Sequence, residues 1–558
     1  MWGWGNFDIV DSFKFLSKHT RDCGLEKDDL LKVIEKLESR KKYGLIWDEE
    51  KTKEQFEKES ENALPVLKEV KGKEIKTDPT KPTNILIEGD NYHALSVLNY
   101  THQGKVDIIY IDPPYNTGKK NEFKYNDSWV DSEDTYRHSK WLSFMAKRLK
   151  LAKNLLAEEG VLFVSIDDNE VAQLKLLLDN FVFSEKNFKT VVIWQKKLRP
   201  SNKNNDGFSS TTEYILMYSK KQGDLKLIPV ELNPDYVKKV YKNPDKDPRG
   251  LWRGQPLWSE SNTNKRKTLL LPDGRKIEQK WFISQKTLDE LYAENKIVET
   301  GKGTLNGKVF LSEIDGKDPM NLLAGEVVGT TEEATKELKL ILGSGENKFM
   351  YPKPTRLIKF LISRVPNNNN STVLDFFAGS GTTGHAVLSL NKEDGGSRKF
   401  ILCTNNEDGL CENVCYPRLK VAINGNDEIE ANSGNLKYFK TAFVKNSISR
   451  DDLKMRITRE CTEMLCLREG IFDEVKAKPD YHIFEQNGRI MGVYYSMERD
   501  SLAQLKKELD KMEGEKILYC FTFDPLGLDK NDFADWQGVS LEPIPQKILD
   551  IYEQIYEY

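Results

Sequence analysis

Short apolar runs alternate with longer amphipathic segments over two stretches of the chain. From residue 84 to about 182, and again from about 355 to 406, runs typical of buried strands are separated by segments with helical spacing of their apolar residues. Strands that alternate with helices predict a parallel sheet covered by helices, so an α/β fold is expected. The predicted strands are 84–89, 106–112, 160–166, 371–375 and 398–406, and the predicted helices are 91–102, 141–159, 171–182 and 355–365.

This alternation is interrupted near residue 190 and lost near residue 440. Residues 191–196 and 213–219 predict a hairpin around a polar loop, and 225–345 hold short irregular elements rich in Trp, Lys, Gly and Pro. We therefore predict one α/β domain that carries a large insertion, with strands again at 481–496 and 516–524. The five predicted regions are a helical, highly charged accessory region (1–80), a first α/β half (81–224), the insertion (225–345), a second α/β half (346–440) and a C-terminal assembly domain (441–558).

The composition is ordinary for a globular protein, with 38% hydrophobic and 31% charged residues among 558. The first residues lack a basic segment followed by an apolar run, and no stretch approaches the ~20 apolar residues of a membrane span, so we expect neither a signal peptide nor a membrane segment. Seven cysteines, an odd number, favour a reducing cytoplasm. Cys411 and Cys415, with Cys403 nearby, could suggest a metal site, but their C-x3-C spacing lacks a second ligand pair, so no metal is expected.

The charge distribution changes the expected partner. The net charge of −4 alone argues against nucleic acid, yet residues 186–280 hold 21 Lys and Arg against 10 Asp and Glu. A basic segment inside an acidic chain is the pattern to look for in phosphate binding, although a solvated basic surface would give the same counts.

The first predicted catalytic motif follows the strand at 106–111 directly and reads Asp112-Pro113-Pro114-Tyr115. Proline cannot donate to a sheet ladder, so these residues could simply terminate a strand. They could also form a rigid turn that holds an acid and an aromatic ring at the end of a core strand. The pattern leaves both interpretations open.

The second motif is a glycine loop in VLDFFAGSGTTG, with glycines at 379, 381 and 384 after Asp375. Glycine allows positive φ and close backbone approach to a ligand, and the helix that follows favours a polar or anionic group. A phosphate loop would need Lys followed by Ser or Thr, which is absent. The spacing matches a dinucleotide fingerprint, but the preceding acid and the residue sequence DFFAGSGTT fit a binding site for S-adenosylmethionine better.

DPPYNTG together with DFFAGSGTT resembles the amino-methyltransferases of DNA, in the β-type order with the catalytic motif upstream. The stretches LIEGDNYHALSVLNYTHQGKVDIIYIDPPYNTG, YRHSKWLSFMAKRLKLAKNLL and VSIDDNE are similar to modification subunits of type III restriction–modification systems. The resemblance covers roughly residues 40–440. It implies a circularly permuted Rossmann-like methyltransferase sheet, with an inserted DNA target-recognition domain and accessory terminal regions, in which both motifs open onto one crevice.

The resemblance also implies the chemistry of the first motif. Asp112 and the carbonyl of Pro113 would accept the N–H hydrogens of an adenine amine, Pro114 would stiffen the turn, and Tyr115 would stack on an extruded base. Aspartate at the first position favours adenine N6 over cytosine. The expected cofactor is S-adenosyl-L-methionine.

Further residues are expected around the cofactor. Asp90 would face its adenine, unless it only caps a helix. Lys353-Pro354 would meet its carboxylate, and Glu407 would hold its ribose, with Asn405 as a rival. The remaining predicted cofactor-binding residues, which lie in or next to the glycine loop, are Asp375, Phe376, Ala378, Gly379, Gly381, Thr382 and Thr383.

Double-stranded DNA is the expected partner, bound by residues of the 195–213 loop and of the insertion. Trp194 would border the base pocket, although core packing explains it equally well. Lys265, Arg266 and Lys267 would position the DNA backbone rather than read bases. The other candidates are Lys196, Lys197 and Lys203. A homodimer and a separate restriction subunit are expected as protein partners, and the alternatives are a solitary methyltransferase, an RNA substrate, or a non-catalytic nucleic-acid-binding protein with a relict fold.

Overall fold

A computed structural model provides the structure of the chain. It describes residues 45, 47, 54 and 63–556, apart from 119–123, 126–127, 131, 201–206, 301–303, 344–350, 448 and 525–526. Most of the predicted helical region at the N-terminus, and Lys203, therefore lie outside the described residues.

A ten-stranded sheet forms the centre of the molecule, in the order β1-β17-β2-β16-β15-β3-β6-β8-β7-β14. Its six inner strands, β17 to β6, are all parallel, and β1 and β8 run antiparallel to their inner neighbours. The predicted parallel α/β sheet is confirmed. The strands are β1 (Ala63–Glu69), β2 (Thr83–Glu88), β3 (Val106–Ile111), β6 (Leu156–Ile166), β7 (Phe188–Gln195), β8 (Thr212–Ser219), β14 (Leu322–Leu323), β15 (Thr372–Asp375), β16 (Lys399–Thr404) and β17 (Asn435–Lys445).

The strand order is permuted relative to the sequence, as expected. β15 lies beside β3, with Val373 paired to Ile108 and Leu374 to Ile109, although more than 260 residues separate the two strands. From this point the chain runs outward in both directions, through α5 to β6 on one side and through α12 to β16 on the other. The sheet therefore reverses its direction of winding between β3 and β15.

Helices cover both faces of the sheet, because its inner strands are apolar on both sides. On β15 the side chains alternate, with Leu374 in the core under α4 and α5 and Val373 in the core under α11, α12 and α13. The helices are α4 (Asn91–Thr101), α5 (Arg137–Leu155), α6 (Val171–Leu177), α11 (Thr355–Arg364), α12 (Thr382–Asp394) and α13 (Tyr416–Asn424).

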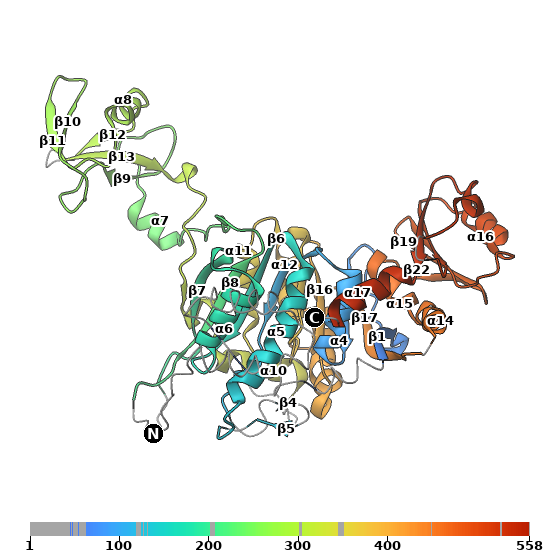
Figure 1. Cartoon of the computed structure of the whole chain (residues 1–558). Coiled ribbons are helices and arrows are strands. Elements are labelled where there is room, and N and C mark those ends of the chain that lie inside the picture. Colours follow the sequence, from blue (N-terminus) through green and yellow to red (C-terminus); the bar gives the residue numbers. More distant parts are fainter. Residues whose placement is uncertain are drawn as a thin grey trace, which may run out of the picture.

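The insertion forms a separate body at one end of the molecule (Figure 1). It has its own small core, which includes Leu257, Trp281 and Leu305. The chain then returns to the central domain, since β14 pairs with β7 and α10 packs on α13. The elements are α7 (Pro234–Val240), β9 (Trp252–Pro256), β10 (Lys267–Leu270), β11 (Lys276–Gln279), α8 (Gln285–Ala293), β12 (Ile297–Glu299), β13 (Leu305–Phe310), α9 (Gly325–Val328) and α10 (Thr331–Leu342).

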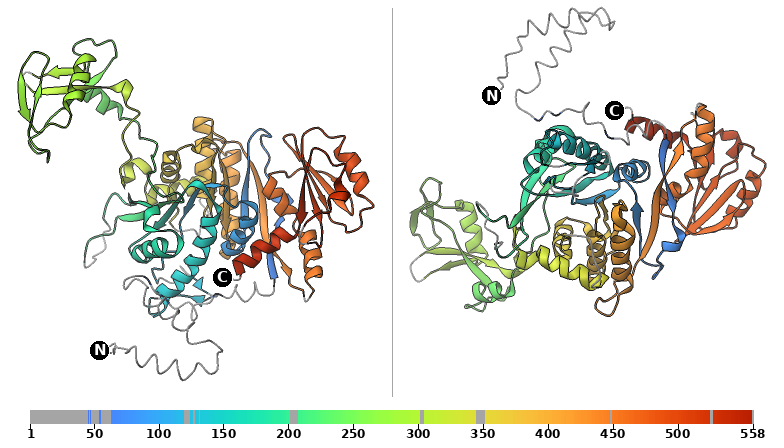
Figure 2. Two further views of the ribbon diagram at one scale, coloured as in Figure 1. Left: turned by 45° about the horizontal axis from the view of Figure 1, so that its top comes forward. Right: turned by 90° about the horizontal axis from the view of Figure 1, so that it is seen from below.

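The C-terminal region lies at the opposite end, and both views in Figure 2 keep the two bodies apart. It contains a five-stranded sheet in the order β18-β19-β20-β21-β22, and its last helix contacts α4. The elements are α14 (Arg450–Glu460), α15 (Thr462–Glu469), β18 (Glu474–Ala477), β19 (Tyr481–Gln486), β20 (Arg489–Tyr494), α16 (Leu502–Leu509), β21 (Glu515–Phe521), β22 (Val539–Ile544) and α17 (Gln546–Tyr556).

Two expectations about secondary structure are wrong. Residues 63–69 form strand β1 rather than helix, because their apolar run ALPVL is buried against β17. Pro65 is tolerated there because β1 is an edge strand. Residues 156–159 begin β6 instead of ending the preceding helix, since Val106 pairs with Leu156.

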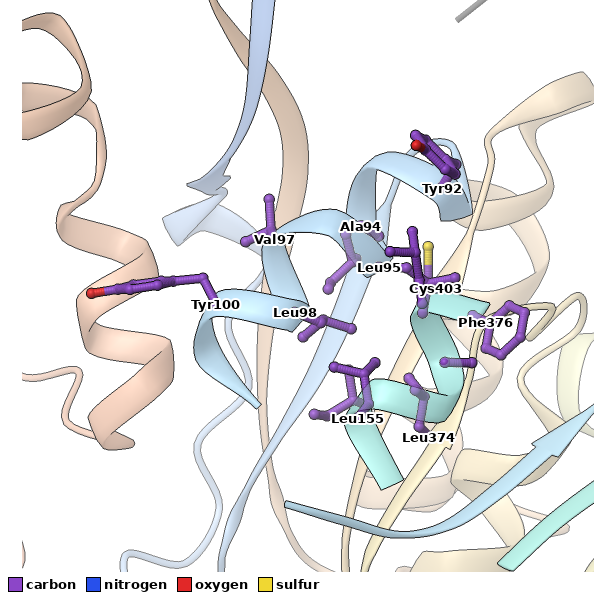
Figure 3. Close-up of a cluster of buried hydrophobic side chains, with 14 of the residues drawn as sticks. Tyr92, Ala94, Leu95, Val97, Leu98, Tyr100, Leu155, Leu374, Phe376 and Cys403 are labelled. Atoms are coloured by element: carbon purple, nitrogen blue, oxygen red, sulfur yellow. The ribbon is translucent and has the colours of Figure 1, made fainter. Parts of the chain in front are cut away.

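The core between α4, α5 and the sheet is shown in Figure 3, where Leu98, Leu155 and Leu374 come together. All three are fully buried. Since Leu374 lies on the strand that joins the two halves of the sheet, we expect Leu374→Ala to destabilise the central domain by about 3 kcal/mol. The urea midpoint followed by circular dichroism measures this. Leu340→Ala, at a position 52% exposed on α10, is the control and should change stability by less than about 0.5 kcal/mol. Equal midpoints for the two variants would contradict the expectation.

Candidate functional site

The two sequence motifs meet at one edge of the central sheet. Asp112 follows β3 directly and Asp375 is the last residue of β15, and these strands are parallel neighbours. The carboxyl ends of parallel strands face the same edge, and here the winding of the sheet reverses between them, which is where ligands bind in open α/β sheets. The two motifs therefore lie at one sheet edge, and their common crevice stays a prediction.

The turn after β3 is held from α5. Trp141, which is fully buried, donates from Nε1 to the carbonyl of Pro114 at 2.7 Å. Asn116 closes the turn in the left-handed region at φ 56°, a conformation that asparagine tolerates better than most residues. The turn is thus fixed by two side chains as well as by its prolines.

A buried acid lies behind the same turn. Glu170, whose side chain is fully buried, accepts from Asn116 Nδ2 at 2.5 Å and lies 2.6 Å from His138 Nδ1. Burial raises the pKa of the Glu170 carboxyl to about 8, and the hydrogen bond from Asn116 opposes this only in part. Burial, and then the charge of Arg137, lower the pKa of His138. Near pH 7 the pair is therefore neutral, with the proton on the carboxyl group.

The glycine loop is organised around Asp375. Its carboxylate accepts from the Phe377 amide at 3.0 Å and from the Thr383 hydroxyl at 2.5 Å, so it joins the strand end to the first turn of α12. Gly379 and Gly381 have φ values of 50° and 78°. Burial raises the pKa of Asp375 to about 7 despite the two hydrogen bonds, and the charge of Asp112 acts in the same direction.

A fully buried arginine supports the outer side of the loop. Arg418 of α13 donates from Nη1 to Ser380 Oγ at 3.2 Å and to Thr382 Oγ1 at 2.8 Å. Its Nη2 reaches Glu337 of α10 at 3.2 Å and Thr355 at 3.0 Å. Arg418 therefore ties the glycine loop to the start of α11, where Lys353-Pro354 lies.

The opposite side of the loop is tied to α4 and α5. Asn91 donates to the Phe376 carbonyl at 2.9 Å and accepts from Arg148 Nε at 2.5 Å. Asp90 caps α4 by accepting from the Tyr92 amide, and its second oxygen lies 3.3 Å from Arg148. The helix-cap interpretation of Asp90 is confirmed, and its contact with the cofactor stays a prediction.

Lys353 lies against the first motif. Its ammonium is 2.8 Å from both oxygens of Asp112, 2.8 Å from the Tyr115 hydroxyl and 3.3 Å from Glu213 Oε2. Burial acts to lower its pKa, but the two carboxylates outweigh this and raise the pKa above its ordinary value. Lys353 is therefore charged, and its expected contact with the cofactor's carboxylate is untested.

The other predicted site residues fall into three groups. Pro354 is buried as the N-cap of α11, and Ala378 donates its amide to the Cys403 carbonyl beside the glycine loop. Trp194 is buried with its Nε1 bonded to the Gly329 carbonyl, so packing accounts for it, and its ring lies 5.8 Å from the Lys353 ammonium. The exposed group comprises Glu407, Lys197, Lys265, Arg266 and Lys267, of which Arg266 pairs with Glu260 at 2.6 Å.

Comparison with known proteins decides the family. The family described as DNA methylase matches residues 106–413, which include both motifs. The chain is a member of the DNA methylase family. The Type III restriction-modification enzyme StyLTI Mod subunit of Salmonella typhimurium is 39% identical over 349 residues, which are 58% of this chain and 52% of that protein. The Type II methyltransferase M.KpnI of Klebsiella pneumoniae is 32% identical over 362 residues, 59% of this chain and 82% of that protein.

A second Mod subunit, that of EcoPI from Escherichia phage P1, is 35% identical over 58% of each chain. The chain thus spans about half the length of the Mod subunits it matches. Among solved structures, the PvuII DNA methyltransferase (cytosine-N4-specific) covers 71% of this chain and 96% of its own, at 12% identity and a TM-score of 0.33. So low a score adds nothing to what the strand order shows.

Several residues that shape this site are not evident from its motifs. Glu213 and Lys196 form an ion pair of 3.1 Å beside Tyr115, whereas the sequence predicts only a DNA contact for Lys196. Trp141 and Glu170 lie in the stretches YRHSKWLSFMAKRLKLAKNLL and VSIDDNE, but these stretches do not reveal their contacts with the turn, and Arg418 lies outside both. Full burial is the signal that marks all three, and a single sequence does not display burial.

The cysteines form no metal site in the part of the chain that the structure describes. There, no group of three or more His, Cys, Asp or Glu side chains is arranged to hold an ion. Cys403, Cys411 and Cys415 are buried and unpaired, and burial raises the pKa of Cys411 to about 11. Among the described helices, none is long and apolar enough to cross a membrane.

The protonated Glu170 predicts a pH dependence of stability. Its pKa is about 8 in the folded chain and near 4.5 when unfolded, so its stabilisation is complete below pH 4.5 and falls as the pH rises through 8. Glu170→Gln removes this titration. Between pH 5 and 8.5 the wild type should therefore lose about 4 kcal/mol of stability relative to the variant, as measured by urea unfolding.

Glu159→Gln is the matched control for this prediction, because the Glu159 side chain is 69% exposed. Its stability should follow that of the wild type at every pH. Parallel pH profiles for wild type and Glu170→Gln would show that Glu170 is ionised in the folded protein.

Proposed function

We propose that the chain transfers a methyl group from S-adenosyl-L-methionine to the N6 amine of adenine in a specific sequence of double-stranded DNA. The observation that carries this is the placement of the Asp112-Pro113-Pro114-Tyr115 turn beside the glycine loop, at the end of neighbouring strands, in a member of the DNA methylase family. Aspartate at the head of the turn supports adenine as the base.

The residues of the glycine loop fit this cofactor. The left-handed Gly379 and Gly381 allow a ligand to approach the backbone closely, and Asp375 offers a buried carboxylate to a cationic amino group. When bound, the cofactor would supply an activated methyl group. Arg418 and Asn91 hold the loop from two sides, so the site is organised by the chain itself.

The turn fits the target. An adenine amine is a poor nucleophile because its lone pair is delocalised into the ring, and acceptors for its N–H hydrogens localise that pair. Asp112 Oδ and the Pro113 carbonyl would be these acceptors, held in position by Trp141 through Pro114. Tyr115 would stack on the base once it leaves the duplex.

The DNA would lie between this edge of the sheet and the insertion. The excess of 11 positive charges in residues 186–280 supports backbone binding, and the exposed Lys265 and Lys267 suit phosphate contacts. The insertion, a separate body with its own core, would read the sequence. The acidic remainder of the chain would face away from the DNA.

We further propose that the chain works with a separate restriction subunit and dimerises through its C-terminal region. The Mod subunits among its relatives support the first point, and the five-stranded sheet remote from the active edge supports the second. The second candidate is methyl transfer without such a subunit, and the relative M.KpnI is named a type II methyltransferase. Light scattering on the full chain over a range of protein concentrations tests the dimer, and the mass of a single chain at every concentration would contradict it.

Methyl transfer with tritiated cofactor and DNA from a host lacking the modification tests the function. Asp112→Ala should lower the rate by about 10²–10⁴-fold, because the amine loses its acceptor, while calorimetric cofactor affinity is kept. Gly379→Val should instead lose cofactor binding, since a β-branched residue is strained at φ 50°.

Asp168→Ala is the matched control, an exposed aspartate after the neighbouring strand β6, and it should keep the wild-type rate. A wild-type protein that binds the cofactor but methylates no DNA would overturn the proposed function. A near-normal rate for Asp112→Ala would overturn its mechanism.

The pKa of Asp375, about 7 without ligand, predicts how cofactor affinity depends on pH. A cationic amino group binds the ionised carboxylate, which is lost as the pH falls below 7. Affinity should therefore drop by about tenfold per pH unit between pH 7 and 5.5. Calorimetry measures this, and Asp375→Asn should bind more weakly with a flat profile. A flat wild-type profile would contradict the assignment.

A further inference from the structure

The groups assigned to the target base, Asp112 and Tyr115, which we call the target-base pocket, are already contacted by another side chain, the ammonium group of Lys353. It contacts both Asp112 oxygens at 2.8 Å and lies 5.0 Å from the centre of the Tyr115 ring. Lys353 is 8% exposed, whereas the Asp112 side chain is 26% exposed and so can be reached from outside. The Lys353 ammonium thus contacts the Asp112 carboxylate and lies beside the Tyr115 ring, the two groups that the base would use.

Lys353 and an entering adenine would compete for the same groups. An adenine amine needs a carboxylate oxygen of Asp112 that is free to accept its hydrogen, and a base stacked on Tyr115 needs the ring face. An ammonium held between both oxygens satisfies the carboxylate and stands beside that ring. Base entry therefore requires Lys353 to move, and a buried ammonium that moves without a new partner is strongly destabilised.

Glu213 of β8 supplies such a partner. Its Oε2 is 3.3 Å from the Lys353 ammonium and 3.1 Å from the Tyr115 hydroxyl, and the residue is 8% exposed. Its other oxygen accepts at 3.1 Å from Lys196, the residue directly after the adjacent strand β7, which fixes the carboxylate. Burial acts to raise the pKa of Glu213, but the charges of Lys353 and Lys196 hold it below the ordinary value.

The charges around the pocket balance. Two carboxylates, of Asp112 and Glu213, face two ammonium groups, of Lys353 and Lys196. A shift of Lys353 from one carboxylate to the other leaves this balance unchanged, and its ammonium already lies within 3.3 Å of both. The Tyr115 hydroxyl lies within 3.1 Å of both carboxylates and can turn its single proton to whichever one Lys353 has left.

We propose that Lys353 is a displaceable occupant of the target-base pocket and that Glu213 is the residue that receives its ammonium when adenine enters. Glu213 is thus a positioning residue, which acts through Lys353 and does not touch the base. The inference rests on the proposed function, because it names how the same pocket admits its substrate. In the absence of a base, the ammonium of Lys353 stays bound to the Asp112 carboxylate that would otherwise accept from adenine.

A double-mutant cycle on the full chain tests this proposal, with tritiated methyl transfer to unmodified plasmid DNA as the readout. Glu213→Gln keeps the shape of the side chain but removes the charge that receives Lys353. We expect it to lower kcat/KM for DNA at least tenfold, mainly through KM, with the cofactor Kd unchanged. In a Lys353→Met background there is no ammonium to receive, so the same change should lower kcat/KM less than twofold.

Glu69→Gln is the matched control, because Glu69 pairs with the buried Lys437 at 2.6 Å on β1 and β17, away from the pocket. It should leave KM for DNA unchanged in both backgrounds. Equal losses from Glu213→Gln in both backgrounds, or a weaker cofactor Kd, would overturn the proposal. So would a Lys353→Met protein that binds cofactor without measurable transfer, because a group that must leave the pocket cannot be required for the reaction.

These outcomes are separate from failure of the proposed function. If the wild type transfers no methyl group to DNA, the function itself fails. If the wild type is active and Glu213→Gln matches it in kcat/KM, only the role of Glu213 fails.

Discussion

The parallel pairing of β3 with β15 is the constraint on which the rest of the site depends. It brings together the ends of two strands from distant parts of the sequence, and with them Asp112 and Asp375. Two carboxylates at one sheet edge repel each other, and the structure handles them differently. Asp112 is neutralised by Lys353, whereas Asp375 is buried with hydrogen-bond donors and has its pKa raised to about 7. The two halves of the site thus differ in charge although each is built on an aspartate.

The glycine loop and the base pocket are also connected through the protein. Arg418 contacts Thr382 in the loop and Thr355 at the start of α11, and Lys353 lies two residues before Thr355. Glu337 of α10 contacts both Arg418 and Thr355. Although burial opposes its ionisation, His385 and Arg418 lower the pKa of Glu337 to about 2. A charged, buried junction of this kind tolerates little displacement. The backbone position of Lys353, from which its side chain can still rotate, is therefore set by the same residues that shape the loop.

The sequence was sufficient for the sheet and for the two motifs, because buried strands and glycine loops leave strong local patterns, and the swapped order of the halves followed from the resemblance to DNA amino-methyltransferases. It was not sufficient for the residues that support them. Glu213 reads as one polar residue at the start of a hairpin strand, and Arg418 as one cation on a helix. Their roles depend on burial and on partners far along the chain. Strand β1 was missed because its apolar run follows a long charged segment that favours helix.

The separate core of the insertion has a consequence for how the protein can diversify. Leu257, Trp281 and Leu305 pack among themselves and not into the central sheet. Substitutions on the surface of this body therefore change what it contacts without altering the stability of the strands that carry Asp112 and Asp375. A new target sequence could arise in this body while the chemistry of methyl transfer stayed the same, so specificity and catalysis are free to evolve at different rates.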